Sequence, residues 1–188
     1  MWFILLWKKQ DGSLLQQAFD DELGIPESCN GIPDVLDEAR FELEWLLKMQ
    51  DTLNGGVYHK VTTAAFPGFI MPQDDTDELI VSPISAAATG DFAALLAMAS
   101  GVYENIDKAF AQKMRTAAEK AWNYLEANPV LQGFTNPSDI STGEYGDTDS
   151  TDERYWAAAE LYKLTGNQKY NDAVKKIIAV SVPSGLGW

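Results

Sequence analysis

Residues 84–99 decide the fold, and they read Ile-Ser-Ala-Ala-Ala-Thr-Gly-Asp-Phe-Ala-Ala-Leu-Leu-Ala-Met-Ala. This stretch is apolar nearly all round and rich in small residues, which is typical of a helix buried among closely packed neighbours. Ser82 and Pro83 stand in front of it as a predicted cap and first-turn proline. The sequence therefore predicts an inner helix that other helices surround.

Residues 106–127 predict a helix of a different kind. It has one apolar stripe and a charged opposite face, and the stripe consists of Phe110, Met114, Ala117, Ala121 and Leu125. We predict further helices over 33–50, 152–164 and 168–180, an extended segment at 57–61 and a long loop after Pro129. No βαβ pattern is present. The alternation of inner and outer helices predicts an all-α fold in two layers, as in helical toroids and bundles.

Composition limits the classes of function. The 188 residues carry a formal net charge of −14, so nucleic acid and anionic membrane are poor partners and a neutral or cationic ligand fits better. The single cysteine, Cys29, excludes an intramolecular disulfide and a cysteine-rich zinc site. The apolar opening at 1–7 is too short to span a bilayer and has no lysines in front of it. We interpret it as the tail of a buried helix rather than as a signal peptide.

Carboxylates are the candidate functional groups, because the chain has one histidine and neither a nucleophile elbow nor a phosphate-binding loop. The cluster within 144–153 lies in the long loop, beside Tyr145, and continues into a predicted helix. Such oxygen-rich loops suit calcium; the alternative is that Asp152 and Glu153 only complement the helix dipole, with Ser150 or Thr151 as the cap.

Other side chains have two interpretations. His59, alone beside a tyrosine, is either a hydrogen-bonded structural residue or a functional group. Aromatic side chains bind sugar rings well, but most of the six tryptophans, Trp45 and Trp122 for example, fall on helical stripes and are expected in the core.

Five linked segments, in the same order along the chain, closely resemble glycoside hydrolase family 9, which consists chiefly of endo-β-1,4-glucanases. They are Ile25-Pro26-Glu27-Ser28 with NGIPDVLDEAR (30–40), ELEWLLKMQ (42–50), GGVYHKVT (55–62), TGEYGD (142–147) and DERYWAAAELY (152–162). The resemblance implies an (α/α)6 barrel, of which residues 1–188 would be an internal fragment of the catalytic domain, about half of the barrel.

The resemblance also implies an activity and a set of residues. The activity is hydrolysis of β-1,4-glucan with inversion, by one carboxylate that activates water and one that protonates the leaving oxygen. The family's Asp-Ala-Gly-Asp-like base motif and its C-terminal acid motif do not occur in these 188 residues. We therefore assign no catalytic residue and expect the chain alone to be inactive.

The residues that the resemblance carries over are not catalytic. His59 matches a position that lines the glucan cleft, and Tyr145 lies in a loop of that cleft. Asp152 and Glu153 match a calcium-binding pair, with Asp149 as a helper, and no organic cofactor is implied. β-1,4-Glucan is thus the expected partner, and the compartment stays open because family members are mostly secreted and these residues show no signal peptide.

Two alternatives from other classes remain. The chain could be a non-catalytic glucan-binding protein, or an interaction module that completes a barrel with another chain. In the second case, apolar faces of inner helices, such as 86–99, would drive self-association.

Overall fold

The computed structural model describes residues 20–131 and 133–180. Its main helices are α2 (Asp34–Leu46), α3 (Ala86–Tyr103), α4 (Lys108–Ala127), α5 (Thr151–Thr165) and α6 (Gln168–Val180), with 3-10 turns η1 (Leu47–Met49) and η2 (Pro72–Asp74). These helices confirm the predicted all-α class. The predicted helix tail at 1–7 and the two ends of the predicted domain, 1–188, lie outside the described residues.

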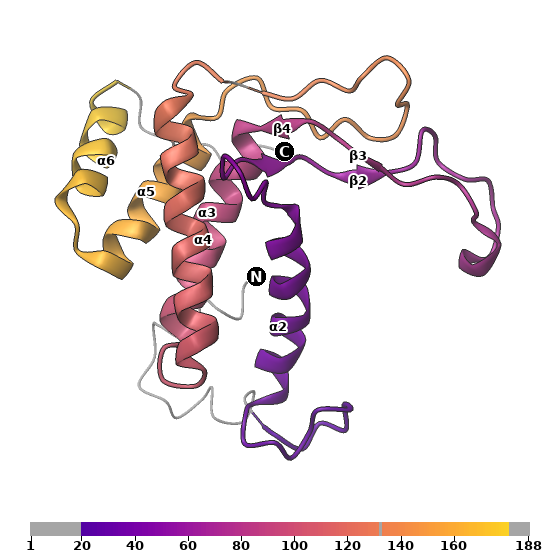
Figure 1. The fold of residues 1–188 in the computed structure, drawn as a ribbon, viewed down its shortest axis with the longest axis horizontal. Coiled ribbons are helices and arrows are strands. Elements are labelled where there is room, and N and C mark those ends of the chain that lie inside the picture. The colour runs from indigo at the N-terminus through magenta and orange to yellow at the C-terminus, as the bar shows by residue number, and fades with distance from the viewer. Residues whose placement is uncertain (1–19, 132, 181–188) are drawn as a thin grey trace.

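Helix α3 lies at the centre of the fold, between α4 and α5 (Figure 1). Fourteen of its 18 residues are buried, on all sides of the helix, as the apolar sequence predicts. The described residues contain one helix long and apolar enough to cross a membrane, and it is this one. Because 78% of that helix is buried inside the protein, its apolar character is accounted for by the core.

Helix α2 is attached to α3 and α4 by polar contacts as well as by apolar packing. The buried Tyr103 hydroxyl donates to the Leu36 carbonyl of α2. Arg40, also on α2, donates to Asp107, the residue that caps α4, over 2.8 Å. These contacts keep α2 alongside the pair α3–α4, and α6 packs against α5 on the other side (Figure 1).

Four short strands form an antiparallel hairpin between α2 and α3. β1 (Val57–Tyr58) pairs with β4 (Ile84–Ser85), and β2 (Val61–Thr62) pairs with β3 (Ile80–Val81). The predicted extended segment is therefore confirmed. The predicted cap at Ser82 and Pro83 is wrong, because β4 follows these residues and the Ser85 side chain accepts the Ala88 N–H instead.

The expected exposure of 86–99 is also wrong, because α4 and α5 already cover α3 within the chain. The large apolar side chains that do face solvent include several on the outer helices and on the hairpin. Phe41 and Trp45 of α2 are 78% and 42% exposed, and Ile178 of α6 is 43% exposed. The arm between β2 and β3 adds Phe66 and Phe69.

Gly90 allows α3 and α5 to approach closely. A Cβ built on Gly90 would lie 2.7 Å from Glu153 Cβ and 3.0 Å from the Glu153 carbonyl carbon. Real Cβ atoms essentially never approach another atom to 2.7 Å, and the backbone contact is also tight, so a side chain here would force the helices apart. Gly90 thereby fixes the position of the first turn of α5 relative to α3.

We predict that Gly90→Ala lowers the free energy of unfolding by about 1–3 kcal/mol, the usual cost of overpacking a well-filled interface. Denaturant unfolding followed by circular dichroism measures it. The control is Lys113→Ala on the exposed face of α4, which should change stability by no more than about 0.5 kcal/mol. An unchanged or raised stability of Gly90→Ala would show that the two helices do not meet at this glycine.

Candidate functional site

The hairpin and the long loop between α4 and α5 lie at the same end of the helices (Figure 1). Residues 133–150 of this loop form neither helix nor strand, and contacts to the hairpin hold them in place. The Ser141 N–H donates to the Ala64 carbonyl over 2.7 Å, and the Thr62 and Thr142 hydroxyls lie 2.8 Å apart. The hairpin and the loop therefore form one continuous surface.

His59 is the centre of this surface. Its ring stacks on Phe134, with the centroids 3.8 Å apart and the planes at 9°. Nδ1 lies 2.8 Å from the Ser85 hydroxyl and Nε2 lies 3.1 Å from the Glu144 carbonyl. Because a carbonyl only accepts, we assign the ring proton to Nε2, which leaves Nδ1 to accept from Ser85. Both nitrogens are thus engaged within the protein.

The surroundings of His59 favour its neutral form. Burial of the ring lowers its pKa below the ordinary value, and the positive charge of Lys60 lowers it further, against the opposing effect of the Glu144 hydrogen bond. At neutral pH the ring is therefore uncharged, which agrees with one donating and one accepting nitrogen.

Tyr145 presents an aromatic ring to solvent. Its side chain is 76% exposed, and its backbone φ of 51° lies in the left-handed region. That conformation costs a residue other than glycine about 1 kcal/mol, so the surrounding contacts must maintain it. The ring rests on Gly143, where an added Cβ would lie 3.0 Å from Tyr145 Cζ.

A cavity of about 380 Å³ opens beside His59. Aromatic and aliphatic side chains line most of it, and Asp91 is the one carboxylate that the described residues contribute. The aromatic and charged lining residues are Trp45, Tyr58, His59, Lys60, Asp91, Phe92 and Trp156. Trp122 is 4% exposed, as expected for the core. For Trp45 the core expectation is wrong, because its helix has no partner on that side among the described residues and the indole lines the cavity instead.

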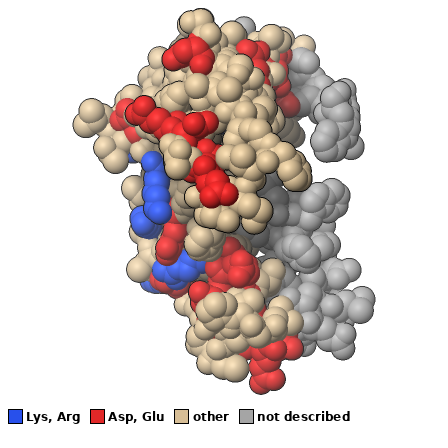
Figure 2. All heavy atoms as spheres, turned by 90° about the vertical axis from the view of Figure 1, so that its right-hand side faces the viewer, with Lys and Arg blue, Asp and Glu red and all other residues tan. Residues whose placement is uncertain are grey.

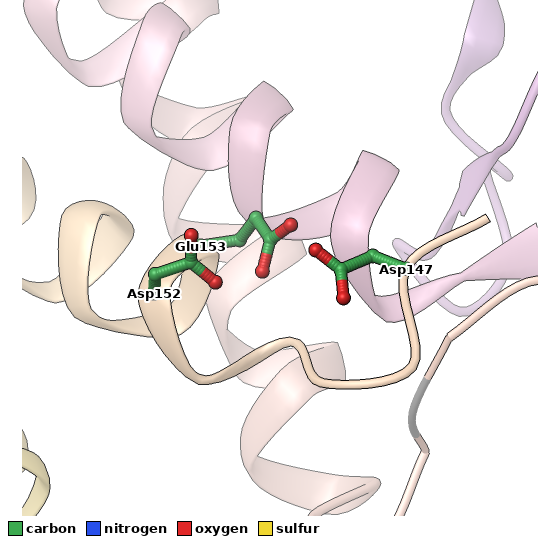
Figure 3. Close-up of side chains that lie close together, drawn as sticks. All are labelled: Asp147, Asp152 and Glu153. Atoms are coloured by element: carbon green, nitrogen blue, oxygen red, sulfur yellow. The ribbon is translucent and has the colours of Figure 1, made fainter. Parts of the chain in front are cut away.

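Three carboxylates meet at the start of α5. Asp147 in the loop and Asp152 and Glu153 in the first turn offer oxygen atoms that all lie within 4.8 Å of one another. Figure 3 shows the carboxylates of Glu153 and Asp147 turned toward each other, with Asp152 beside them. Glu153 Oε2 is buried and has no hydrogen-bond partner among the described residues. This group could hold a metal ion.

Burial, and then the neighbouring carboxylates, raise the pKa of Glu153 and of Asp91 on the adjacent α3. Burial, followed by the contact with Asp152 and the charge of Asp91, raises the pKa of Glu153 to about 8. Loss of water around Asp91, followed by the charges of Asp152 and Asp147, raises the pKa of Asp91 to about 6. Acidic side chains also outnumber basic ones on the face that Figure 2 shows, in keeping with the net charge.

Asp149 has a different environment. Its Oδ1 accepts the Thr151 N–H over 3.0 Å and the Thr151 hydroxyl over 2.5 Å, as a side chain that caps the start of a helix does. The structure therefore brings Asp152 and Glu153 together with Asp147, and it places Asp149 outside that group. Neither expected cap, Ser150 nor Thr151, accepts a backbone N–H of α5 with its side chain in the described structure; the Ser150 hydroxyl accepts from Arg154 Nε instead, over 3.2 Å.

Sequence reasoning missed three contributors to this site: Lys60, Phe134 and Asp147. Phe134 reaches His59, and Lys60 reaches Thr142 and Gly143, only through contacts between segments about 80 residues apart. No local pattern signals such contacts. Asp147 stands in the quoted TGEYGD segment, but its spacing from Asp152 gave no reason to prefer it to Asp149.

The comparisons with known proteins agree with the fold and the motifs. Endoglucanase D of Acetivibrio thermocellus is 44% identical over 149 residues, which is 79% of this chain and 24% of that protein. The xyloglucan-specific endo-beta-1,4-glucanase BoGH9A of Bacteroides ovatus is 42% identical over 178 residues, 89% of this chain and 30% of that protein. This chain thus spans less than a third of the length of these two relatives.

A solved structure extends the likeness to three dimensions. AaCel9A in complex with cellobiose-like isofagomine matches with a TM-score of 0.79 and 42% identity, over 85% of this chain and 30% of that one. The helices described above are accordingly part of an (α/α)6 barrel. The family model for glycosyl hydrolase family 9 matches residues 5–183, and the chain belongs to that family.

Proposed function

We propose that this chain supplies one wall of the β-1,4-glucan cleft of a family 9 endoglucanase. The observation that carries the proposal is the pair of half-buried His59, which stacks on buried Phe134, and exposed Tyr145, beside a cavity that several aromatic side chains line. Aromatic faces suit the apolar faces of sugar rings, and the acidic exterior suits a neutral polysaccharide better than an anionic one. The names of the relatives, endoglucanases of the same family, support the same ligand class.

The proposed activity belongs to the whole enzyme, not to these residues alone. Inverting hydrolysis needs two carboxyls about 6.5–9.5 Å apart, one on each side of the scissile bond. The cavity has one carboxyl among its described lining residues, Asp91. The three carboxyls at the start of α5 are crowded together rather than set across a cleft. We infer that the base and the acid are supplied from outside the 188 residues.

We predict that the 188-residue chain binds cellohexaose. The variant His59→Ala should weaken this binding at least tenfold, which is about 1.4 kcal/mol. It removes the ring that stacks on Phe134 and holds the loop. Isothermal titration calorimetry measures the affinity. Tyr162→Ala, which changes an exposed tyrosine outside the cavity lining, is the control and should bind normally.

The same preparation should not hydrolyse soluble cellulose derivatives above background. No binding by the wild-type chain would contradict the proposed wall of the cleft. Clear turnover by pure protein would contradict the assignment of the catalytic pair to other residues, and Asp147 and Asp149 would then be the first to test.

We further propose that the carboxylates at the start of α5 bind a calcium ion that stabilises the loop. Asp147, Asp152 and Glu153 fit this role because calcium takes several carboxylate and carbonyl oxygens, and Glu153 Oε2 lacks a hydrogen-bond partner in the described part of the chain. The ion would attach the loop to α5. Asp149 would not be a fourth ligand of the ion. It would support the site indirectly, because its carboxylate accepts a hydrogen bond from Thr151 at the start of α5.

We predict that calcium at about 100 times its Kd stabilises the chain by about 2.7 kcal/mol, which raises Tm by roughly 5–10 °C. Asp152→Asn should abolish the shift, because it removes a charged ligand. Asp77→Asn, in an exposed acidic segment of the arm, should keep it. Differential scanning calorimetry measures both, and an equal shift in the two variants would show that calcium acts elsewhere.

The barrel-completing alternative is favoured by one observation, the exposed apolar face of α2. We propose that Phe41 and Trp45, four residues apart on this helix, form the contact through which the isolated chain self-associates.

Light scattering at rising concentration should then give a mass above 20.7 kDa, and Phe41→Ser should restore the monomer. Phe69→Ser on the arm is the matched control and should leave association unchanged. A strictly monomeric wild type would contradict self-association. If Phe69→Ser were monomeric and Phe41→Ser were not, the contact would lie on the arm rather than on α2.

A further inference from the structure

Lys60 occupies the junction between the hairpin and the long loop, although neither the motifs nor the proposed cleft assigns it a role. Its Nζ donates to the Gly143 carbonyl over 2.5 Å and to the Thr142 hydroxyl over 3.2 Å. It also lies 5.8 Å from the ring centroids of both Phe134 and Tyr145. Four groups of the loop thus converge on one ammonium.

The charge of Lys60 is satisfied by the loop alone. Within the described residues, the ion pairs do not include Lys60, so no carboxylate competes for its three donors. A partly buried ammonium without a carboxylate is held by carbonyl oxygens and by aromatic faces, and both are present here. Removal of the ammonium would therefore leave the Gly143 carbonyl without this donor and would remove the cation that the Phe134 and Tyr145 rings face.

Gly143 connects Lys60 to Tyr145. The Tyr145 ring packs so closely over Gly143 that an added Cβ would lie 3.0 Å from Cζ. Lys60 holds the carbonyl of this same glycine, and it also faces the Tyr145 ring directly. Because Tyr145 has a left-handed backbone, its orientation depends on such contacts rather than on local preference.

We propose that Lys60 is a positioning residue for glucan binding, which sets the orientation of the exposed Tyr145 ring through Gly143 and through its own charge. This inference rests on the proposed function, in which Tyr145 is a sugar-binding surface. The inference goes beyond the proposed function, because it makes Lys60 a determinant of the affinity for glucan without direct contact between Lys60 and glucan.

The test measures cellohexaose affinity for the 188-residue chain in a double-mutant cycle. Lys60→Met keeps most of the length of the side chain and removes the donors. It should weaken binding about tenfold, as expected for the loss of charged hydrogen bonds. Lys60→Arg should restore most of the affinity. In the Tyr145→Ala background, Lys60→Met should cause no further loss, because the ring that it positions is gone.

A second measurement does not need glucan. In a chain labelled with fluorotyrosine, the fluorine resonance of residue 145 should be shifted from that of the free amino acid. In Lys60→Met it should move toward the free value, and in Lys60→Arg it should stay. Lys113→Met, on the exposed face of α4, is the control for loss of a lysine, and Tm measurements show whether each variant is folded.

The outcomes separate the two proposals. If the wild-type chain does not bind cellohexaose, the proposed cleft fails, and an unchanged fluorine resonance in Lys60→Met then overturns the positioning role as well. If the wild type binds and Tyr145→Ala weakens binding but Lys60→Met does not, only the positioning role is overturned. A further loss from Lys60→Met in the Tyr145→Ala background would show that Lys60 contacts glucan directly, which also overturns it.

Discussion

The enclosure of α3 is the constraint on which the rest of the structure depends. A helix that is apolar on every side gains stability only when neighbours cover all of it, at about 25 cal/mol per Å² of apolar surface. Its alanines and Gly90 let those neighbours come close, and at Gly90 the α5 backbone is in van der Waals contact. The position of α5 is therefore fixed by the burial of α3, and with it the position of the carboxylates in the first turn of α5.

The N-terminus of α3 connects this core to the candidate cleft. The Ser85 hydroxyl accepts the Ala88 N–H as the helix cap and donates to His59, whose other nitrogen donates to the Glu144 carbonyl. One turn later, the buried Thr89 hydroxyl accepts the N–H of Val57 in β1 and donates to the Ser85 carbonyl. A single hydrogen-bonded chain thus runs from the buried helix to the long loop. Because each member is satisfied by the next, the loop is ordered without secondary structure of its own.

Sequence periodicity was sufficient to predict the helices but not to predict which side chains meet at the candidate site. The apolar spacing of α3 and α4 depends on neighbouring residues, so a local pattern predicts it, and Gly166 ends α5 in the left-handed conformation that such a glycine favours. The contact of Lys60 with Gly143 joins residues 83 apart, and nothing near either residue indicates it. A long-range contact also decides that Ser85, and not Ser82, caps α3. The pairing of Ile84 with Tyr58 in the hairpin keeps the chain extended up to Ser85. Roles that depend on such long-range pairing become visible only in the folded chain.

The charge arrangement at the start of α5 argues that its carboxylates are not placed for stability alone. The helix dipole favours acidic residues in a first turn by about 0.3–1 kcal/mol, a small gain beside the cost of crowding three carboxylates. Arg154, which follows them directly, does not neutralise them. Its guanidinium donates instead to the carbonyls of Leu125, Asn128 and Leu131 and so closes the C-terminal end of α4. The nearest cationic side chain in the sequence is therefore committed to the helix end. Among the described residues, no ion pair includes these carboxylates, so a bound cation would offset a negative charge that this part of the chain leaves unpaired.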